Sequence, residues 1–395
     1  MKGGIFMPTL NRTEVANLVN LSAQETLGEI PVQLNEDLSN VVDMGKQIFD
    51  SDKVDTYTKK LVNHIGRVVV VDRPYSAKLP SLYMDSWEFG SVLEKITIEM
   101  PEAEENESWE LNHGEVYEQD IFYQPTVSVK FYDKYTTFEV PMSITDKQLK
   151  QSFTNGAQLT AFVSAIYTAI DNKLALATEN LTMRAINNMV SAVVYNEFST
   201  GVYNDNSGVR AVNLFYLFKQ ANPDTELTAN TCIYSPEFIR FASFVIGMYP
   251  DRMERLSKAF NVGGMERHTP KDRLHILMLS EFSKSANAYL QSDTFHDEFT
   301  RLPEAETVPY WQGSGTNYAF SETSKISVKN AENNTVTITG VLCCMFDKYA
   351  CGVTNFDKRT TTHYNSKAEF QNFWYKQDAG YFNDLNENFV VFFVA

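Results

Sequence analysis

The chain is short of basic residues, of cysteine and of long apolar runs. It has 34 lysines and arginines against 50 aspartates and glutamates, which gives a net charge of −16. This balance argues against a protein that grips nucleic acid through a basic surface. Four cysteines in 395 residues do not make a disulfide framework. The longest weakly polar run, Ala157–Ile170, is shorter than the roughly 20 apolar residues of a membrane span, so we expect no membrane segment.

Catalytic and metal-binding motifs are also missing. The six histidines are scattered and form no paired ligand spacing. The glycines at 263–264 and 313–315 lack the length and the following lysine of a phosphate-binding loop, and Ser314 is not in a GxSxG motif. Cys343 and Cys344 lie in an apolar segment without a CxxC spacing, which favours small buried side chains over a metal site. We therefore predict no catalytic residue, no cofactor and no metal, and a protein that is not an enzyme.

The composition is that of a folded protein. Apolar residues make up 43% of the chain and aromatic residues 13%, which excludes a disordered polypeptide. The length suits two or three domains with a well-buried core. The first residues show no apolar run followed by a small-residue cleavage site, so we expect a protein that is not secreted.

One very long helix is the clearest predicted element. Thr145 and Asp146 form a plausible helix cap, and Asn155-Gly156 should end the short helix that follows. From Ala157 to Val194, apolar residues recur close to every 3.6 residues, which predicts one helix of about 55 Å. Shorter helices are expected over 13–19, 38–49, 212–218, 238–248 and 253–260.

Alternating segments predict strands elsewhere in the chain. Val127–Phe131 and Thr136–Val140 alternate apolar and polar residues, which predicts strands of a long antiparallel hairpin. Further strands are expected at 67–71, 274–279, 341–346, 360–363 and 389–394.

Negative charge gathers in one stretch of the chain. Between Glu94 and Asp120 there are ten acidic residues and one base, Lys95, so this stretch carries −9 and the rest of the chain −7. Such a tract cannot pack as a core, and it must project into solvent or meet a basic partner surface. Nearby aromatics, Tyr123 and Phe131 among them, could stack on bases or sugars. The acidic surroundings favour strand packing and subunit contacts instead.

The order of these elements resembles the major capsid protein of tailed bacteriophages with the Hong Kong 97 (HK-97) fold, in particular that of phi-29-like short-tailed phages. The resemblance covers the chain from about residue 50 to its end. Its carrying segments are Asn63–Val70, Phe131–Thr137, Thr145–Phe153, Phe162–Ile170, Leu256–Asn261, Thr360–Asn365 and Asp378–Leu385.

The resemblance implies an α+β fold of the HK-97 type with an N-terminal arm, an extended β-hairpin loop, a long spine helix, and peripheral and axial domains. The arm has few apolar residues of its own to bury. The implied ranges are 1–60 for the arm, 61–81, 141–196 and 341–395 for the peripheral domain with the spine helix, 82–140 for the extended loop, and 197–340 for the axial domain.

The resemblance also implies a function. Copies of the chain would self-assemble as pentamers and hexamers into an icosahedral or prolate head that encloses double-stranded DNA non-specifically. Scaffolding and portal proteins would be further partners, without a membrane, and the head would be assembled in the bacterial host cytoplasm before it becomes the virion capsid. The subunit-interface candidates are Glu102, Glu104, Glu105, Glu107, Tyr123 and Phe131.

Two alternatives stay open at this point. One is an encapsulin-type compartment with the same fold and an enzyme cargo. The other is a non-viral surface or carbohydrate-binding protein, which the aromatic content would suit.

Overall fold

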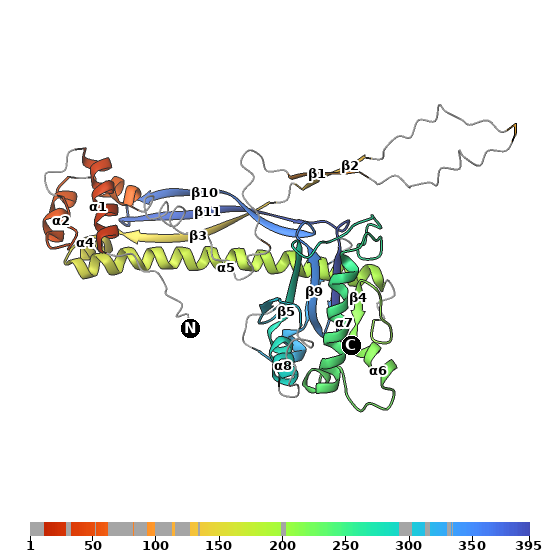
Figure 1. Ribbon diagram of the computed structural model, residues 1–395. Helices are drawn as coiled ribbons and strands as arrows, with labels where there is room; N and C mark the ends of the chain where they lie inside the picture. The colour runs from red at the N-terminus through yellow and green to blue at the C-terminus, as the bar shows by residue number, and fades with distance from the viewer. Residues whose placement is uncertain are drawn as a thin grey trace. The chain divides into compact units, whose positions relative to one another are not determined.

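The computed structural model describes most of the chain, and Figure 1 shows its helices and strands. The described residues are 12–28, 33–51, 53–61, 82, 93–98, 113–114, 127–132, 135–198, 203–291, 302–312, 317–329, 333 and 335–395. The strand predicted over 67–71 lies outside them.

The chain divides into two compact units. Unit 1 contains residues 1–80, 135–181 and 354–380, and unit 2 contains residues 81–134, 182–353 and 381–395. A long helix and two long strands begin in one unit and end in the other. The division into arm, loop, peripheral domain and axial domain concerns roles in an assembly, and it stays a prediction.

The N-terminal helices of unit 1 belong to a well-formed core. These helices are α1 (Arg12–Leu27), α2 (Val41–Phe49) and a helical segment at 54–61. Val19, Met44 and Tyr57 are completely buried, in one cluster with Leu149 and Phe153. The expectation that the arm has few apolar residues to bury is therefore wrong for its described part. The apolar partners come from segments far along the chain, which a local pattern cannot reveal.

A short helix, α4 (Asp146–Ser152), begins where the sequence predicts it. The Thr145 hydroxyl accepts the backbone N–H of Gln148, and the Gln148 side chain accepts the backbone N–H of Thr145. This reciprocal capping box satisfies two donors that the helix itself leaves unpaired. The predicted cap is confirmed.

The long helix is α5 (Gly156–Glu197), with 42 residues. It contains the whole predicted range of 157–194 and is roughly 60 Å long. Its first residue must be small, because a Cβ on Gly156 would lie 2.7 Å from the Cβ of Leu38. In unit 1, the buried face of α5 includes Val163 and Ile170, which belong to the same core as the N-terminal helices.

Three long strands form an antiparallel sheet in the order β10–β11–β3. Their bounds are Cys351–Asn365 for β10, Phe370–Asn383 for β11 and Tyr135–Thr145 for β3. The predicted strand at 360–363 lies inside β10. Residues 136–140 are a strand as predicted, but their expected hairpin with 127–131 is wrong, because β3 pairs with β11. Alternation predicts that a segment is a strand, but it does not identify the strand's partner.

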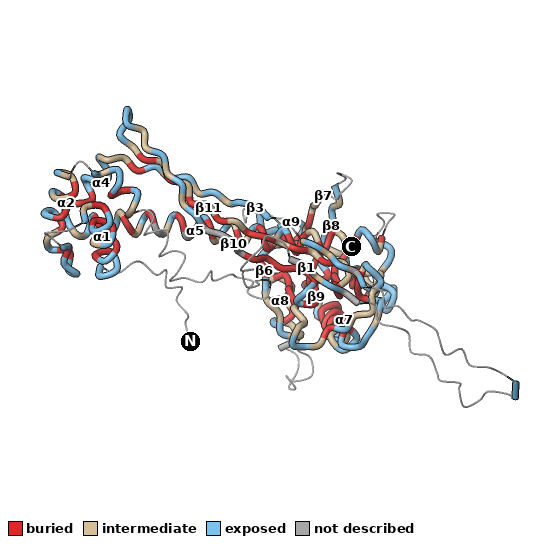
Figure 2. The backbone as a smooth tube through the Cα atoms, turned by 90° about the horizontal axis from the view of Figure 1, so that it is seen from above, coloured by how far each residue is buried: buried red, intermediate tan, exposed pale blue. Residues whose placement is uncertain are grey.

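A five-stranded mixed sheet is the centre of unit 2, in the order β4–β12–β9–β5–β6. The bounds are Ala211–Asn213 for β4, Phe389–Phe393 for β12, Val341–Asp347 for β9, Leu274–Leu279 for β5 and Glu306–Val308 for β6. Every residue of β9 and β12 is buried, and Figure 2 shows β9 in red. The strands predicted at 274–279, 341–346 and 389–394 are confirmed. The prediction of buried thiols is confirmed as well, because Cys343 and Cys344 are buried and free.

Helices and short strands accompany this sheet. They are α6 (Leu214–Ala221), η3 (Cys232–Tyr234), α7 (Pro236–Met253), α8 (Ser280–Gln291), α9 (Phe320–Thr323), β7 (Ile326–Lys329) and β8 (Thr335–Ile338). The helix predicted over 238–248 lies inside α7. The helix predicted over 212–218 is right only from Leu214, because Val212 pairs with Phe392 in the sheet.

The helix predicted over 253–260 is wrong. The chain leaves α7 at Met253, whose carbonyl accepts the N–H of Thr269. Ser257 pairs with Arg267 in an isolated bridge, and the backbone N–H of Phe389 donates to the carbonyl of residue 260. These tertiary hydrogen bonds override the helical spacing of the sequence.

The remaining pair of strands is β1 (Leu93–Ile98) and β2 (Val127–Tyr132). They belong to unit 2 and form a two-stranded antiparallel ribbon, to which the described residues add no third strand (Figure 1). The ribbon flanks most of the acidic stretch in the sequence.

Candidate subunit-interface site

The register of the ribbon sorts its side chains onto two faces. Directly opposite residues of an antiparallel pair share a face, and successive residues alternate between the faces. Ile96 stands opposite Val129, and Lys95 stands opposite Lys130. One face therefore carries apolar side chains, and the other carries two lysines side by side.

We use the name apolar face for the side of the ribbon with Ile96, Val127, Val129 and Phe131, where the register also places position 94, a glutamate, opposite Phe131. The exposed fractions of these four apolar side chains are 62%, 52%, 43% and 64%, respectively. A two-stranded hairpin is only marginally stable in water, and neighbouring exposed apolar side chains mark an interaction surface. This face is therefore a candidate interaction surface.

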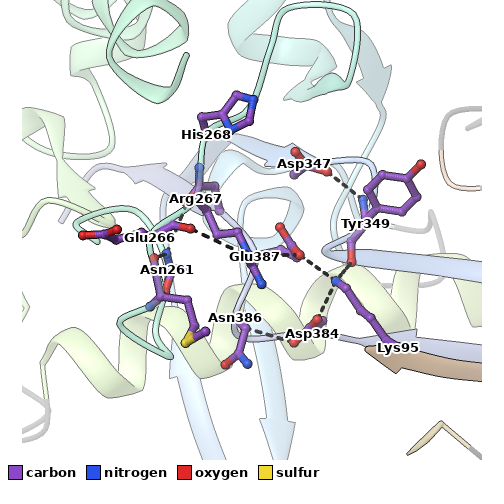
Figure 3. Close-up of polar contacts among 12 residues, drawn as sticks. Lys95, Asn261, Glu266, Arg267, His268, Asp347, Tyr349, Asp384, Asn386 and Glu387 are labelled. Carbon is purple, nitrogen blue, oxygen red and sulfur yellow. Dashed lines mark hydrogen bonds and ion pairs between the residues drawn. The ribbon is translucent and has the colours of Figure 1, made fainter. Parts of the chain in front are cut away.

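The other face is held by the chain itself. Lys95 Nζ donates to Asp384 Oδ2 at 2.6 Å and to Glu387 Oε1 at 2.7 Å, as Figure 3 shows. Lys130 Nζ donates to Asp384 Oδ1 at 2.9 Å. The Asp384 side chain is 1% exposed, so one buried carboxylate receives one lysine from each strand. These four residues form the lysine clamp.

The acidic half of the clamp is fixed in the segment between β11 and β12. The backbone N–H of Asp384 donates to the Ala350 carbonyl at 2.7 Å, and Asp384 Oδ1 accepts the N–H of Asn386 at 3.0 Å. Arg267 Nε lies 3.4 Å from Glu387 Oε1, so Glu387 faces two cations. Both carboxylates are thereby placed by residues outside the ribbon.

Electrostatics favour the ionised clamp. Burial alone would raise the pKa of the Asp384 carboxyl, but the hydrogen bonds and charges of Lys95 and Lys130 outweigh burial and hold that pKa below its usual value. Asp384 is therefore negative at neutral pH.

A ring contact supports the clamp on the neighbouring rung. Tyr132 packs against Phe382, with ring centroids 5.6 Å apart. Burial first, and then the negative charge of Asp384, raises the pKa of Tyr132, so its hydroxyl is neutral. The lysine-bearing face is thus covered by unit 2 while the apolar face is not.

Of the six predicted interface residues, only Phe131 falls in the described part of the chain. It lies on the apolar face. Glu102, Glu104, Glu105, Glu107 and Tyr123 lie outside the described residues, so their role stays a prediction.

Sequence reasoning missed the clamp. Lys95 is conspicuous as the one base among ten acids, and Asp384 lies in a segment that carries the capsid resemblance. The two residues are 289 positions apart, so no local pattern joins them. Tertiary structure supplies the connection.

Other kinds of site find no support among the described residues. No group of three or more histidine, cysteine or acidic side chains there could hold a metal ion. The four cysteines are buried and free, and burial raises the pKa of the Cys232 thiol to about 12. No helix in the described ranges is long and apolar enough to cross a membrane.

Comparisons with known proteins complete these observations. The family described as Phi29-like phage major capsid protein matches residues 19–393. No curated protein matches the chain. The structure of the head fiber and inner core protein gp22 of native bacteriophage P68 has a TM-score of 0.50 at 12% identity, and the match covers 82% of this chain and 86% of that one.

Two capsid structures are similar at a lower level. The capsid of Staphylococcus phage Andhra has a TM-score of 0.43 at 12% identity, with 80% of this chain and 83% of that chain covered. The capsid of cyanophage P-SCSP1u has a TM-score of 0.43 at 9% identity, with 80% and 86% covered.

Proposed function

Because the chain belongs to the family of Phi29-like phage major capsid proteins, we propose that its copies associate through the apolar face of the ribbon when they build the shell. The chain is a capsid shell protein with an α+β fold of the HK-97 type. It is a structural protein of the virion. Neither an encapsulin-type compartment nor a surface carbohydrate-binding protein is favoured by this family.

The observation that carries the proposal is the exposure of Ile96, Val127, Val129 and Phe131 on one face of an otherwise anchored ribbon. In a shell, each copy of the chain is surrounded by other copies, and we propose that one of them covers the apolar face. Four side chains supply only part of a stable interface, which buries about 800 Å² on each partner. The remainder of the contact must come from other surfaces of the two copies.

The larger assembly would have closed symmetry. Copies would form pentamers and hexamers that close an icosahedral or prolate head, because a heterologous contact makes a finite particle only when its rotations close. Scaffolding and portal proteins would take part, and assembly would occur in the bacterial host cytoplasm. The finished shell would act without any enzymatic step of its own.

Double-stranded DNA would be enclosed rather than bound. Outside the acidic stretch, the chain still carries a net charge of −7. A mildly acidic wall does not attract DNA phosphates, so packed DNA can move in and out of the head.

Phe131→Glu tests the proposed interface. Phe131 is 64% exposed, so the substitution should leave the fold of the single chain intact while it puts a charge in the apolar contact. We expect a loss of most shells, measured by light scattering and negative-stain microscopy, with circular dichroism as the check on folding. Phe131→Leu keeps the surface apolar and should still assemble. A normal shell yield from Phe131→Glu would show that the apolar face is not part of the contact between copies.

A further inference from the structure

The lysine clamp distinguishes one register of the ribbon from all others. In steps of two, the ladder pairs residue 93 with residue 132, Lys95 with Lys130, and residue 97 with residue 128. Only the middle rung carries two ammonium groups. A slip of one strand by two residues would keep every side chain on its own face, but it would place the two lysines on different rungs.

An isolated ribbon would avoid the observed register. Like charges directly opposite each other destabilise an antiparallel pair, and among the described residues neither strand pairs with a third one that would hold it in place. Lys95 and Lys130 are such a pair. The register found in the structure therefore needs a negative partner that both lysines reach at once.

Asp384 is that partner. Its two oxygens are divided between the strands, with Oδ2 at 2.6 Å from Lys95 and Oδ1 at 2.9 Å from Lys130. Of the two lysines, Lys95 is the one that also pairs with Glu387, at 2.7 Å, so β1 has one ion pair more than β2. Asp384 is 1% exposed, and its backbone N–H donates to the Ala350 carbonyl, so its position is fixed outside the ribbon. It can reach both lysines at once in one alignment of the two strands.

We propose that Asp384 is the positioning residue that sets the register of the β1–β2 ribbon. Through the register it decides which residues are paired at the end of the ladder, where Ile98 stands opposite Val127 and the segment 99–126 begins. It also decides where the apolar face lies. The proposal concerns the folding of one chain, so it holds or fails independently of the proposed interface between copies.

Pairs of introduced cysteines report the register directly. Ile96→Cys with Val129→Cys joins residues that stand opposite each other, and Ile96→Cys with Val127→Cys joins residues that meet only after a slip of two. The native thiols do not interfere, because all four are buried. The full-length, unassembled chain is oxidised mildly, and cross-linked peptides are quantified by mass spectrometry.

We expect the 96–129 cross-link to exceed the 96–127 cross-link about tenfold in the parent chain, and by about twofold or less after Asp384→Asn. Glu197→Gln is the matched control, because Glu197 is also a mostly buried carboxylate of unit 2, bonded to Arg210 and not to the ribbon. This control should keep the tenfold preference. A ribbon that simply comes apart after Asp384→Asn would also lose the preference, so both yields are compared with those of the chain in denaturant. The proposal predicts a 96–127 yield above that of the denatured chain. A 96–127 yield no higher than that, or an unchanged tenfold preference, would overturn it.

If the Asp384→Asn chain does not fold, variants of Lys130 test the same proposal with the same pairs of cysteines. Lys130 is 38% exposed, so Lys130→Gln removes one leg of the clamp and leaves Asp384 paired with Lys95. We expect an intermediate ratio for Lys130→Gln and a restored ratio for Lys130→Arg, which keeps the charge. A folded Lys130→Gln chain with the parent ratio would refute the role of the clamp in setting the register.

Discussion

The five-stranded sheet and the ribbon both lie in unit 2, yet different forces hold them. In the sheet, β9 and β12 bury every side chain, and Phe346 and Phe389 stack with ring centroids 5.2 Å apart. In the ribbon, one face is attached by ion pairs to Asp384 and the other exposes its apolar side chains. The sheet is complete within one chain, whereas the ribbon needs a second surface. Under the proposed interface, stability and assembly depend on different strands of one unit.

Truncating one aromatic in each region should give the largest contrast. Phe392 in β12 is fully buried against Tyr249, with ring centroids 4.9 Å apart. We expect Phe392→Ala to lower the free energy of unfolding by about 3–5 kcal/mol, because it leaves a cavity. Phe131→Ala should change it by less than about 0.5 kcal/mol, because the ring is exposed. Chemical denaturation of the unassembled chain measures both changes in the free energy of unfolding. If the two variants lost similar amounts, the proposed difference between the sheet and the ribbon would be wrong.

Acid should loosen the ribbon and spare the sheet. The pKa of Asp384 is lowered in the folded chain from its ordinary 3.8, so its ion pairs stabilise the ribbon fully above that value. The stabilisation is lost as the pH falls through the folded pKa. We expect the amide hydrogens of β1 and β2 to lose protection below pH 3.8 while those of β9 keep theirs.

Hydrogen exchange with mass spectrometry tests this, with rates corrected for the pH dependence of unprotected amides. Asp384→Asn is the control, since without the carboxyl the ribbon should have low protection at every pH. Equal loss of protection in β9 and the ribbon would mean that acid unfolds the unit as a whole.

Elements with a strong local pattern could be predicted from the sequence. The 3.6-residue period located α5 nearly to its ends, and the Thr145–Gln148 capping box located the start of α4. The apolar runs at β5, β9 and β12 were equally clear, since strands buried on both faces contain few polar residues.

Features that depend on distant partners could not be predicted. The sequence shows that Val127, Val129 and Phe131 share a face, but the usual rule would turn this face inward. It turns outward because Lys95 and Lys130 bind Asp384 across more than half of the chain's length. The packing of Tyr57 against Phe153, in the cluster that also contains Met44, was hidden for the same reason.

Substitutions in the acidic stretch should have the smallest effect on the stability of a single chain and a clear effect on the assembly of many copies. Glu102, Glu104, Glu105 and Glu107 belong to the stretch of net charge −9. Each exposed ion pair contributes only about 0–1 kcal/mol, so one substitution should do little, and all four changed to glutamine should impair or misdirect assembly. Shell yield and size are measured by light scattering and negative-stain microscopy, and the fourfold change to aspartate, which keeps the charge, is the control.

The same fourfold glutamine variant sharpens the contrast between sheet and ribbon. If the stretch meets another copy, the variant should lose shells while the unfolding free energy and the 96–129 to 96–127 cross-link ratio stay at their parent values. If the unfolding free energy fell instead, the charges would serve the folded chain itself. Unchanged shell yield and size would show that the acidic side chains are solvated and that the apolar face, not the charge, carries the contact between copies.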